Sequence, residues 1–221
     1  MTAADFPPTT ALADTLALRG ERGLLDRERL APVHAPAHPV GGPARTVRVE
    51  PGPGSLAGLY DLLSGPLHGQ VLVIAAAGLS GAIWGEILST AARQGGALAV
   101  VVDGPVRDHA AIPATGLWAW GGRACTVGPA GQAHVAAVDE AVTVGAVTIR
   151  PGDLVVLDAD GVVALPPGSG ALEDARTYAA GETAVLADLA AGVLLRDAYR
   201  HKAGAVERIR RSPTADSGSA P

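Results

Sequence analysis

The sequence predicts a single α/β domain, and three of its features favour this class. The chain has 221 residues, of which 48% are hydrophobic, enough for one domain with a substantial core. Two continuous apolar runs, Val71–Ala77 and Ala97–Val102, are typical of buried parallel strands. A stretch with helical periodicity, Ala82–Arg93, lies between them. A strand–helix–strand unit of this kind joins parallel strands through a right-handed crossover.

Three further elements are predicted before this unit. Thr9–Leu25 has the spacing of leucines expected of a helix. Ala35–Pro43 is rich in proline and glycine and indicates a connector, whereas Arg45–Glu50 alternates and indicates a strand. Leu56–Leu63 predicts a short helix.

The remainder of the chain predicts short strands and then helix. One or two helical turns are expected over Asp108–Ala114. The segments Val142–Arg150, Leu154–Asp158 and Gly161–Leu165 predict strands separated by tight turns. From Gly170 to Tyr199 the apolar residues recur with helical spacing.

Composition excludes several classes of function. The net charge is −5 and no basic stripe is interleaved with aromatic residues, which argues against nucleic acid as a partner. The longest apolar runs are far shorter than the roughly 20 residues that span a membrane. The single cysteine, Cys125, excludes an internal disulfide, and the first residues lack the features of a signal peptide. These observations predict a cytoplasmic protein, and they suit a small-molecule enzyme and a protein-binding module equally well.

Charged residues lie where the second predicted strand ends and where the helix before it begins. Arg107 and Asp108 follow the strand, and Gly85 and Glu86 are near the start of the helix. A right-handed crossover brings both places to the same edge of the sheet, where ligands bind in open α/β sheets. A guanidinium fork matches a carboxylate, and carboxylate oxygens suit Mg²⁺ or Mn²⁺. An Arg–Asp pair is also a common surface ion pair, so the site depends on the convergence of these segments.

Two runs within this region are Gly81–Leu88 and Val101–Asp108, the second with the sequence VVDGPVRD. Both runs resemble segments of the RraA-like family. The stretches Gly42–Val47 and Val147–Val163 also resemble segments of the family, in the expected order. The family includes the 4-hydroxy-4-methyl-2-oxoglutarate aldolases, which are metal-dependent pyruvate aldolases.

The resemblance implies a fold and an assembly. The fold is a compact α/β sandwich of the swivelling β/β/α type, forming one domain over residues 9–203 with a C-terminal helix. A flexible leader, 1–8, and a polar, disordered tail, 204–221, are expected on either side. The assembly implied is a homotrimer or a hexamer with sites at subunit contacts.

The resemblance also implies a reaction and site residues. Arg107 would hold the carboxylate of a 2-oxo acid and the developing pyruvate enolate, and Asp108 with Glu86 would hold Mg²⁺ or Mn²⁺. The backbone from Gly85 to Ile87 would bind the pyruvyl carboxylate, with Glu86 also counted among the catalytic residues. Glu182 lies near the place of an acid supplied by a neighbouring subunit. The implied activity is that of a carbon–carbon lyase, an aldolase or oxaloacetate decarboxylase.

This sequence departs from the family pattern at two places. Ala111 stands where the aldolases have an acid, and no lysine lies between Ala82 and Arg200, although Arg123 could replace the missing cation. A member adapted to another reaction in specialised metabolism is therefore an alternative. A second alternative is a non-catalytic regulator that binds an RNA-degrading endonuclease, and a third is a structural homologue without activity. Asp108 favours the enzyme.

Overall fold

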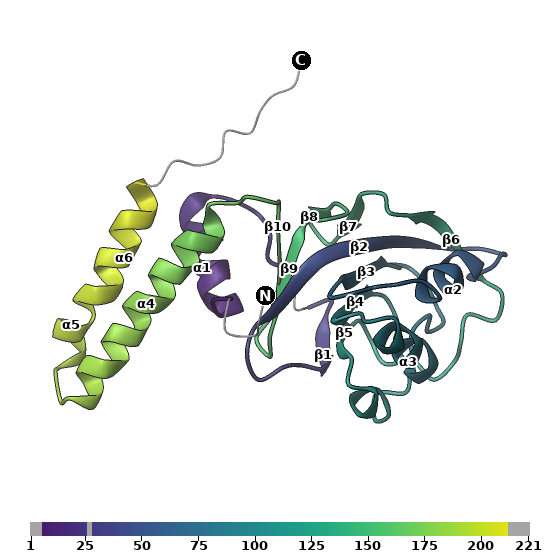
Figure 1. Ribbon diagram of the computed structural model, residues 1–221, viewed down its shortest axis with the longest axis horizontal. Helices are drawn as coiled ribbons and strands as arrows, with labels where there is room; N and C mark the ends of the chain where they lie inside the picture. The colour runs from purple at the N-terminus through teal and green to yellow at the C-terminus, as the bar shows by residue number, and fades with distance from the viewer. Residues whose placement is uncertain (1–5, 26–27, 212–221) are drawn as a thin grey trace, which may run out of the picture.

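A long strand, β2 (Val40–Pro51), organises the computed structural model, which describes residues 6–25 and 28–211 (Figure 1). The first part of β2 pairs antiparallel with β9 (Leu154–Leu157). Its middle pairs parallel with β3 (Val71–Ala75), and its last part pairs antiparallel with β6 (Ala133–Val138). The same strand therefore takes part in both the antiparallel and the parallel pairing of the sheet.

The main sheet of the described residues has eight strands in the order β1-β5-β4-β3-β2-β9-β10, with β6 pairing to β2. The strands not yet placed are β1 (Ala31–His34), β4 (Ala99–Asp103), β5 (Trp118–Gly121), β10 (Val162–Leu165), and the separate hairpin of β7 (Val142–Val144) and β8 (Val147–Ile149). Neighbouring strands from β2 to β5 are parallel. The carboxyl ends of β3, β4 and β5 therefore meet at one edge of the sheet, as the sequence predicted for the first two.

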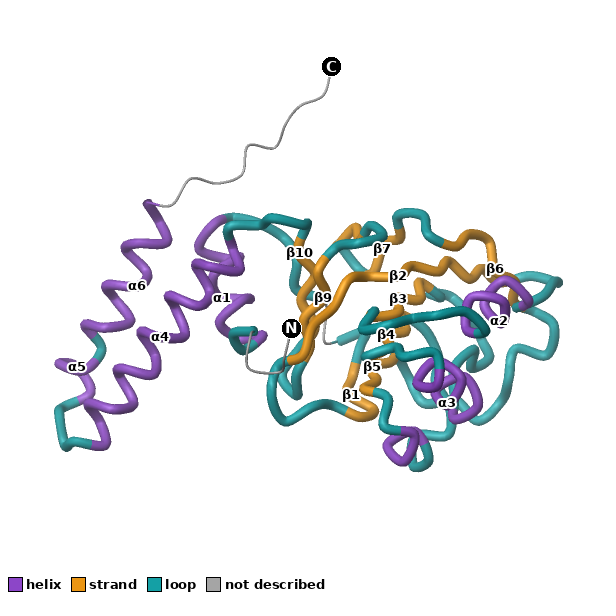
Figure 2. The backbone as a smooth tube through the Cα atoms, in the orientation of Figure 1, coloured by secondary structure: helices purple, strands orange, loops and turns teal. Residues whose placement is uncertain are grey.

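The helices form two groups, one beside the parallel strands and one that extends beyond the β9–β10 end of the sheet (Figures 1 and 2). They are α1 (Thr9–Arg19), α2 (Ala57–Leu63), α3 (Glu86–Gln94), the 3₁₀ helix η1 (Ile112–Thr115), α4 (Ala171–Ala190), α5 (Leu195–Ala198) and α6 (Arg200–Arg211). The last three form a helical arm, residues 171–211, whose far end projects beyond the sheet (Figure 2). No helix of the described residues has the length and apolarity needed to cross a membrane.

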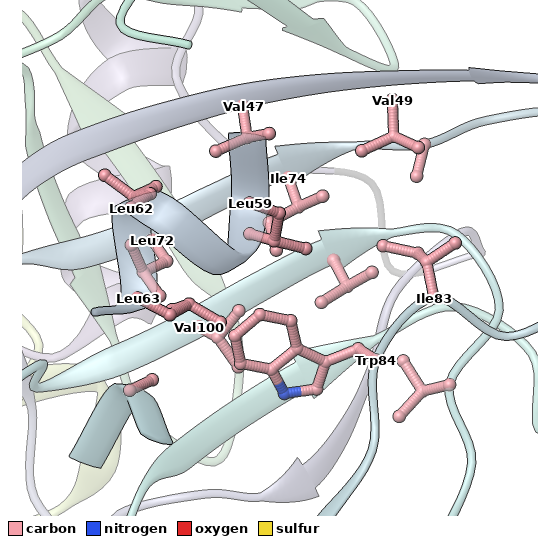
Figure 3. Packing of buried hydrophobic residues seen from close by; sticks show 14 of the residues in the cluster. Val47, Val49, Leu59, Leu62, Leu63, Leu72, Ile74, Ile83, Trp84 and Val100 are labelled. Atoms are coloured by element: carbon pink, nitrogen blue, oxygen red, sulfur yellow. The ribbon is translucent and has the colours of Figure 1, made fainter. Parts of the chain in front are cut away.

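Apolar side chains bury the parallel strands on both faces. On one face, Leu59 of α2 packs with Leu72 of β3 and Trp84 in a single core cluster (Figure 3). On the other face, Trp120 packs with Ile149 and the β7–β8 hairpin. Burial on both faces explains why these strands are continuous apolar runs rather than alternating ones.

Several predicted elements have different bounds in the structure. The first helix ends at Arg19 rather than near residue 25, because Gly20 adopts a left-handed conformation with φ of 67°. The last four residues of the expected connector, Val40–Pro43, belong to β2 instead, because they pair with β9. The single strand expected over Val142–Arg150 is the β7–β8 hairpin, which turns at Gly145.

Parts of the expected leader and tail have defined structure. Phe6 is buried and packs in the same cluster as Leu12, so residues 6–8 are not a loose leader. Residues 204–211 belong to α6, because Ala205 and Ile209 are buried on the helix. The rest of the predicted leader and tail, 1–5 and 212–221, lies outside the described residues. The single α/β domain with a C-terminal helix is confirmed.

Candidate active site

Three chain segments run side by side beyond the carboxyl ends of β3, β4 and β5. Parallel bridges join Trp84 to Val106 and Val106 to Ala124. The N–H of Arg107 donates to the Trp84 carbonyl at 3.0 Å, and the N–H of Cys125 donates to the Val106 carbonyl at 2.9 Å. This short ladder fixes the backbone of Arg107 against the segment that leads into α3.

The same ladder explains why α3 begins later than predicted. The N–H of Ala82 donates to the Val127 carbonyl at 2.8 Å, and that of Ile83 donates to the Pro105 carbonyl at 3.3 Å. These contacts tie residues 82 and 83 to other segments, and Gly85 is extended, so the helix begins at Glu86 instead of Ala82. The start of the helix therefore lies beside the loop that follows β4, as the crossover geometry predicted.

Asp108 connects this loop to the start of α3. Its Oδ2 accepts the N–H of Glu86 at 3.2 Å and lies 3.5 Å from Nε of Arg107. Its backbone has φ of 58°, which is uncommon for a residue other than glycine, and its carbonyl accepts the N–H groups of Ala111 and Ile112. The carboxylate thus takes the place of the helix cap that Gly85 cannot provide.

Gly85 leaves the space that Arg107 and Asp108 occupy. A Cβ atom at this position would lie 2.5 Å from Oδ2 of Asp108 and 2.9 Å from Cγ of Arg107. Its backbone is extended, with φ of −174°, a conformation open to any residue. The glycine is therefore required for close approach and not for its backbone freedom.

A pocket of about 360 Å³ surrounds Arg107 and Asp108. Its lining includes the buried Trp84, whose indole Nε1 donates to Oγ of Ser89 at 2.8 Å. This volume lies within the usual range for small-molecule sites, roughly 300–1,000 Å³. The side chains of Arg107 and Asp108 are 43% and 40% exposed, so both are open to a ligand.

The structure brings most of the predicted site residues together. Gly85, Ile87, Arg107 and Asp108 all line the pocket, while Glu86 is exposed at the first position of α3 and contributes its backbone N–H to Asp108. Glu182 does not line this pocket.

Glu182 lies on α4 in the helical arm, where its Oε1 accepts a hydrogen bond from Nζ of Lys202 at 2.8 Å. Its assignment to a neighbouring subunit's site stays a prediction.

The described acidic residues suit an open metal site rather than one enclosed by protein side chains. No group of three or more His, Cys, Asp or Glu side chains among the described residues is placed to enclose an ion. Mg²⁺ is commonly bound by one or two carboxylates and takes its other ligands from water and substrate. Asp108 and Glu86, whose N–H donates to the Asp108 carboxylate at the helix start, fit this kind of open site.

Arg123 and Cys125 lie near the ladder but outside the pocket. Nη2 of Arg123 donates to the Ser80 carbonyl at 2.8 Å, and the side chain lines a separate hollow of about 260 Å³. Arg123 therefore does not supply a second cation to the Arg107 pocket within the same chain. Hydrogen bonding from the backbone of Val127, aided by the nearby Arg123, lowers the pKa of the Cys125 thiol.

Part of the pocket wall was not predicted from the sequence. Leu56 directly precedes α2, Tyr60 lies in the middle of α2, and Pro129 comes from the loop after β5. These residues belong to no recognisable motif. In the sequence they cannot be distinguished from ordinary core residues.

Comparison with known proteins identifies the family. The model of the RraA-like family, described as Aldolase/RraA, matches residues 9–164, which include the whole pocket. This chain belongs to the RraA-like family. The resemblance drawn from the motifs around Gly85 and Arg107 is thereby confirmed.

Individual RraA-like proteins resemble the chain to different degrees. A protein of Halalkalibacterium halodurans named "Putative 4-hydroxy-4-methyl-2-oxoglutarate aldolase" is 36% identical over 162 residues, 73% of each chain. The solved structure of an uncharacterized protein from Pseudomonas syringae superposes with a TM-score of 0.78 at 24% identity, covering 90% of this chain and 91% of that one, and shows the common fold. Streptomyces coelicolor RraAS2, described as an unusual member of the RNase ES inhibitor RraA family, has a TM-score of 0.64 at 28% identity, covering 79% and 86%.

Proposed function

We propose that this RraA-like protein is a divalent-metal-dependent carbon–carbon lyase that acts on a 2-oxo acid through a pyruvate enolate. The observation that carries the proposal is the meeting of Arg107, Asp108 and the start of α3 in one pocket. The name of the H. halodurans relative supports a lyase. Cleavage of a 4-hydroxy-2-oxo acid and decarboxylation of oxaloacetate would both use this enolate.

Arg107 is the group suited to the negative charge of the substrate. Its guanidinium is permanently charged and offers several donors in one plane, which match a carboxylate or an enolate oxygen. Its backbone is fixed by the bond to the Trp84 carbonyl. Donors that are already in place when charge develops stabilise the transition state without reorganisation.

The first turn of α3 supplies further donors. The N–H groups at the start of a helix have no acceptor within the helix and favour anions. The Glu86 N–H already donates to Asp108, which leaves the N–H groups of Ile87 and Leu88 for the pyruvyl carboxylate. Both residues line the pocket.

Asp108 and Glu86 are the residues that would hold the divalent cation. When bound, Mg²⁺ or Mn²⁺ would supply Lewis-acid stabilisation of the enolate oxygen. The bond from the Glu86 N–H orients the Asp108 carboxylate toward the helix start. This orientation also keeps the carboxylate from pairing fully with Arg107, whose Nε remains 3.5 Å away.

The helical arm supports an assembly of several copies, as a homotrimer or a hexamer. Large apolar side chains are exposed on the distal part of the arm: Leu186, Leu194, Leu195 and Tyr199, with exposed fractions of 66%, 59%, 59% and 47%. Patches of this kind mark protein contacts. Glu182 lies one turn of α4 before Leu186, so we propose that it approaches a neighbouring subunit's pocket.

Exchange of the pyruvate methyl protons in D₂O, followed by NMR, tests the proposal. Enolate formation at C3 gives exchange without any second substrate. We expect exchange with Mg²⁺ or Mn²⁺, little with EDTA, and a loss of roughly 100-fold or more in Asp108→Asn and Arg107→Lys.

A second Arg–Asp pair provides the matched control. Nε of Arg45 lies 2.8 Å from Oδ1 of Asp139, and the two side chains are 30% and 42% exposed, much like the pair in the pocket. Asp139→Asn should exchange pyruvate protons at the rate of the unmodified protein. If Asp139→Asn and Asp108→Asn lost the same fraction of the exchange rate, the assignment of Asp108 to the site would be wrong.

A binding role is the second candidate function. The likeness to S. coelicolor RraAS2, a member of an RNase ES inhibitor family, favours it. Folded protein that shows no exchange with any divalent metal would refute the lyase and leave regulation of an endonuclease as the next hypothesis. A rise in melting temperature with Mg²⁺, absent in Asp108→Asn, would instead support the metal site.

A further inference from the structure

Most of the residues that line the pocket are apolar. Leu56, Tyr60, Leu88 and Pro129 line it together with the buried Trp84. Leu56 and Tyr60 lie at and within α2, Leu88 lies in α3 and Pro129 lies in the loop after β5, so separate segments contribute the same chemistry. The pocket therefore combines one charged pair with a largely apolar lining.

Two apolar side chains at this pocket are left in contact with solvent. Tyr60 is 51% exposed and Ile87 is 73% exposed. They lie on different helices, α2 and α3, and both line the pocket. A ligand with an apolar part would remove their surface from water, which is favourable in proportion to the area covered.

The pocket holds a single positive charge. Among the described residues that line it, Arg107 is the only cation, and Asp108 adds a negative charge beside it. Arg123, the nearest basic residue after β5, is bonded to the Ser80 carbonyl and lines the separate hollow. A substrate with two carboxylates would have one of them against apolar groups without a partner, which is costly.

We infer that the substrate is a monocarboxylic 4-hydroxy-2-oxo acid with an apolar group on C4, an inference that rests on the proposed lyase activity. Arg107 and the start of α3 hold the 2-oxo acid end, and Tyr60, Ile87 and Leu56 select the apolar group. In the cleavage step the C4 hydroxyl loses its proton and becomes an aldehyde carbonyl. The C3–C4 bond breaks, and its electron pair forms the pyruvate enolate, which takes up a proton at C3. The second product is an aliphatic or aromatic aldehyde.

The reverse reaction, the addition of pyruvate to an aldehyde, measures this preference. Pentanal and succinic semialdehyde are nearly equal in length, but only the second carries a carboxylate at its far end. With the full-length protein and Mg²⁺, we expect kcat/KM to be at least about tenfold higher for pentanal, because the carboxylate of succinic semialdehyde would lose water against apolar groups without gaining a partner. Pyruvate methyl exchange is measured on the same sample.

Ile87→Lys changes the rim of the pocket without disturbing the core, because Ile87 is 73% exposed. The added ammonium should shift the ratio of the two kcat/KM values by roughly tenfold toward succinic semialdehyde. Leu24→Lys is the matched control: Leu24 is also an exposed apolar residue, at 47%, and does not line the pocket. We expect its ratio to equal that of the unmodified protein.

The outcomes separate this inference from the proposed function. Methyl exchange with equal or better use of succinic semialdehyde would overturn the apolar substrate and leave the lyase intact. An unchanged ratio in Ile87→Lys would show that this rim does not select the substrate and would also overturn the inference. Absence of exchange would refute the lyase, and the substrate class with it.

Discussion

Substitution of Gly85 by alanine is the sharpest test of the site geometry. The new Cβ would lie 2.5 Å from Oδ2 of Asp108, whereas ordinary contacts of carbon atoms begin near 3.5 Å. The carboxylate must therefore move by roughly 1 Å, and the alkyl chain of Arg107, 2.9 Å away, must move as well. A displacement of about 1 Å in a positioned group can lower the rate about 100-fold, equivalent to about 2.7 kcal/mol.

The same substitution should affect stability much less than activity. Loss of the bond from the Glu86 N–H to Asp108 removes a helix cap, which costs about 0.5–2 kcal/mol. At roughly 2–4 °C per kcal/mol for a chain of this size, the melting temperature should fall by about 1–8 °C. The protein would remain folded at 25 °C while kcat/KM for pyruvate methyl exchange fell about 100-fold.

Gly128→Ala is the matched control. A Cβ at Gly128 would lie 3.5 Å from Nη1 of Arg107, which is an ordinary contact. We expect its kcat/KM to stay within about threefold of the unmodified protein, since no group must move. The reasoning would be refuted if Gly85→Ala retained full activity, or if both alanine variants lost activity equally.

Three further predictions concern other parts of the molecule. Asp158→Ala removes a buried carboxylate that accepts from the first residue of α1 and should lower the free energy of unfolding by about 2–3 kcal/mol in a urea titration; a loss below about 0.5 kcal/mol would contradict this. The hydrogen bond to Glu182 raises the pKa of Lys202, so its contribution to stability is complete below its unfolded pKa of about 10.4 and is lost only as the pH rises through the higher folded pKa. The gap in melting temperature between the unmodified protein and Lys202→Met should thus be constant from about pH 6 to 9; a gap that varies within this range would count against the pairing. Arg123→Gln should move the midpoint of Cys125 alkylation by iodoacetamide to higher pH, and an unchanged midpoint would exclude Arg123 as a cause of the lowered pKa.

The centre of the candidate site could be predicted because its determinants are local. Arg107 and Asp108 directly follow a buried strand, and Gly85 and Glu86 lie in the crossover before it. The handedness of such crossovers then places both segments at one edge of the sheet. Neighbours in sequence and one general rule were enough to bring these residues together.

The position of the helix start required the tertiary structure. Helical periodicity begins at Ala82, but the N–H groups of Ala82 and Ile83 donate to carbonyls from the loops after β5 and β4. These bonds to distant segments outweigh a local preference that is worth less than about 1 kcal/mol per residue. Glu86 consequently becomes the first residue of α3, which is what brings its N–H to Asp108.

The sequence by itself determined the α/β class, the buried strands β3 and β4, and the pairing of Arg107 with the start of a helix. Apolar runs and glycine positions indicate these features, because each feature depends on residues that are close together in the chain. Only the tertiary structure decided that β2 is shared between β9 and β3, that Tyr60 and Pro129 complete the pocket, and where Glu182 lies. Those features arise from contacts between segments far apart in sequence, and an apolar residue carries no local sign of which distant surface it will meet.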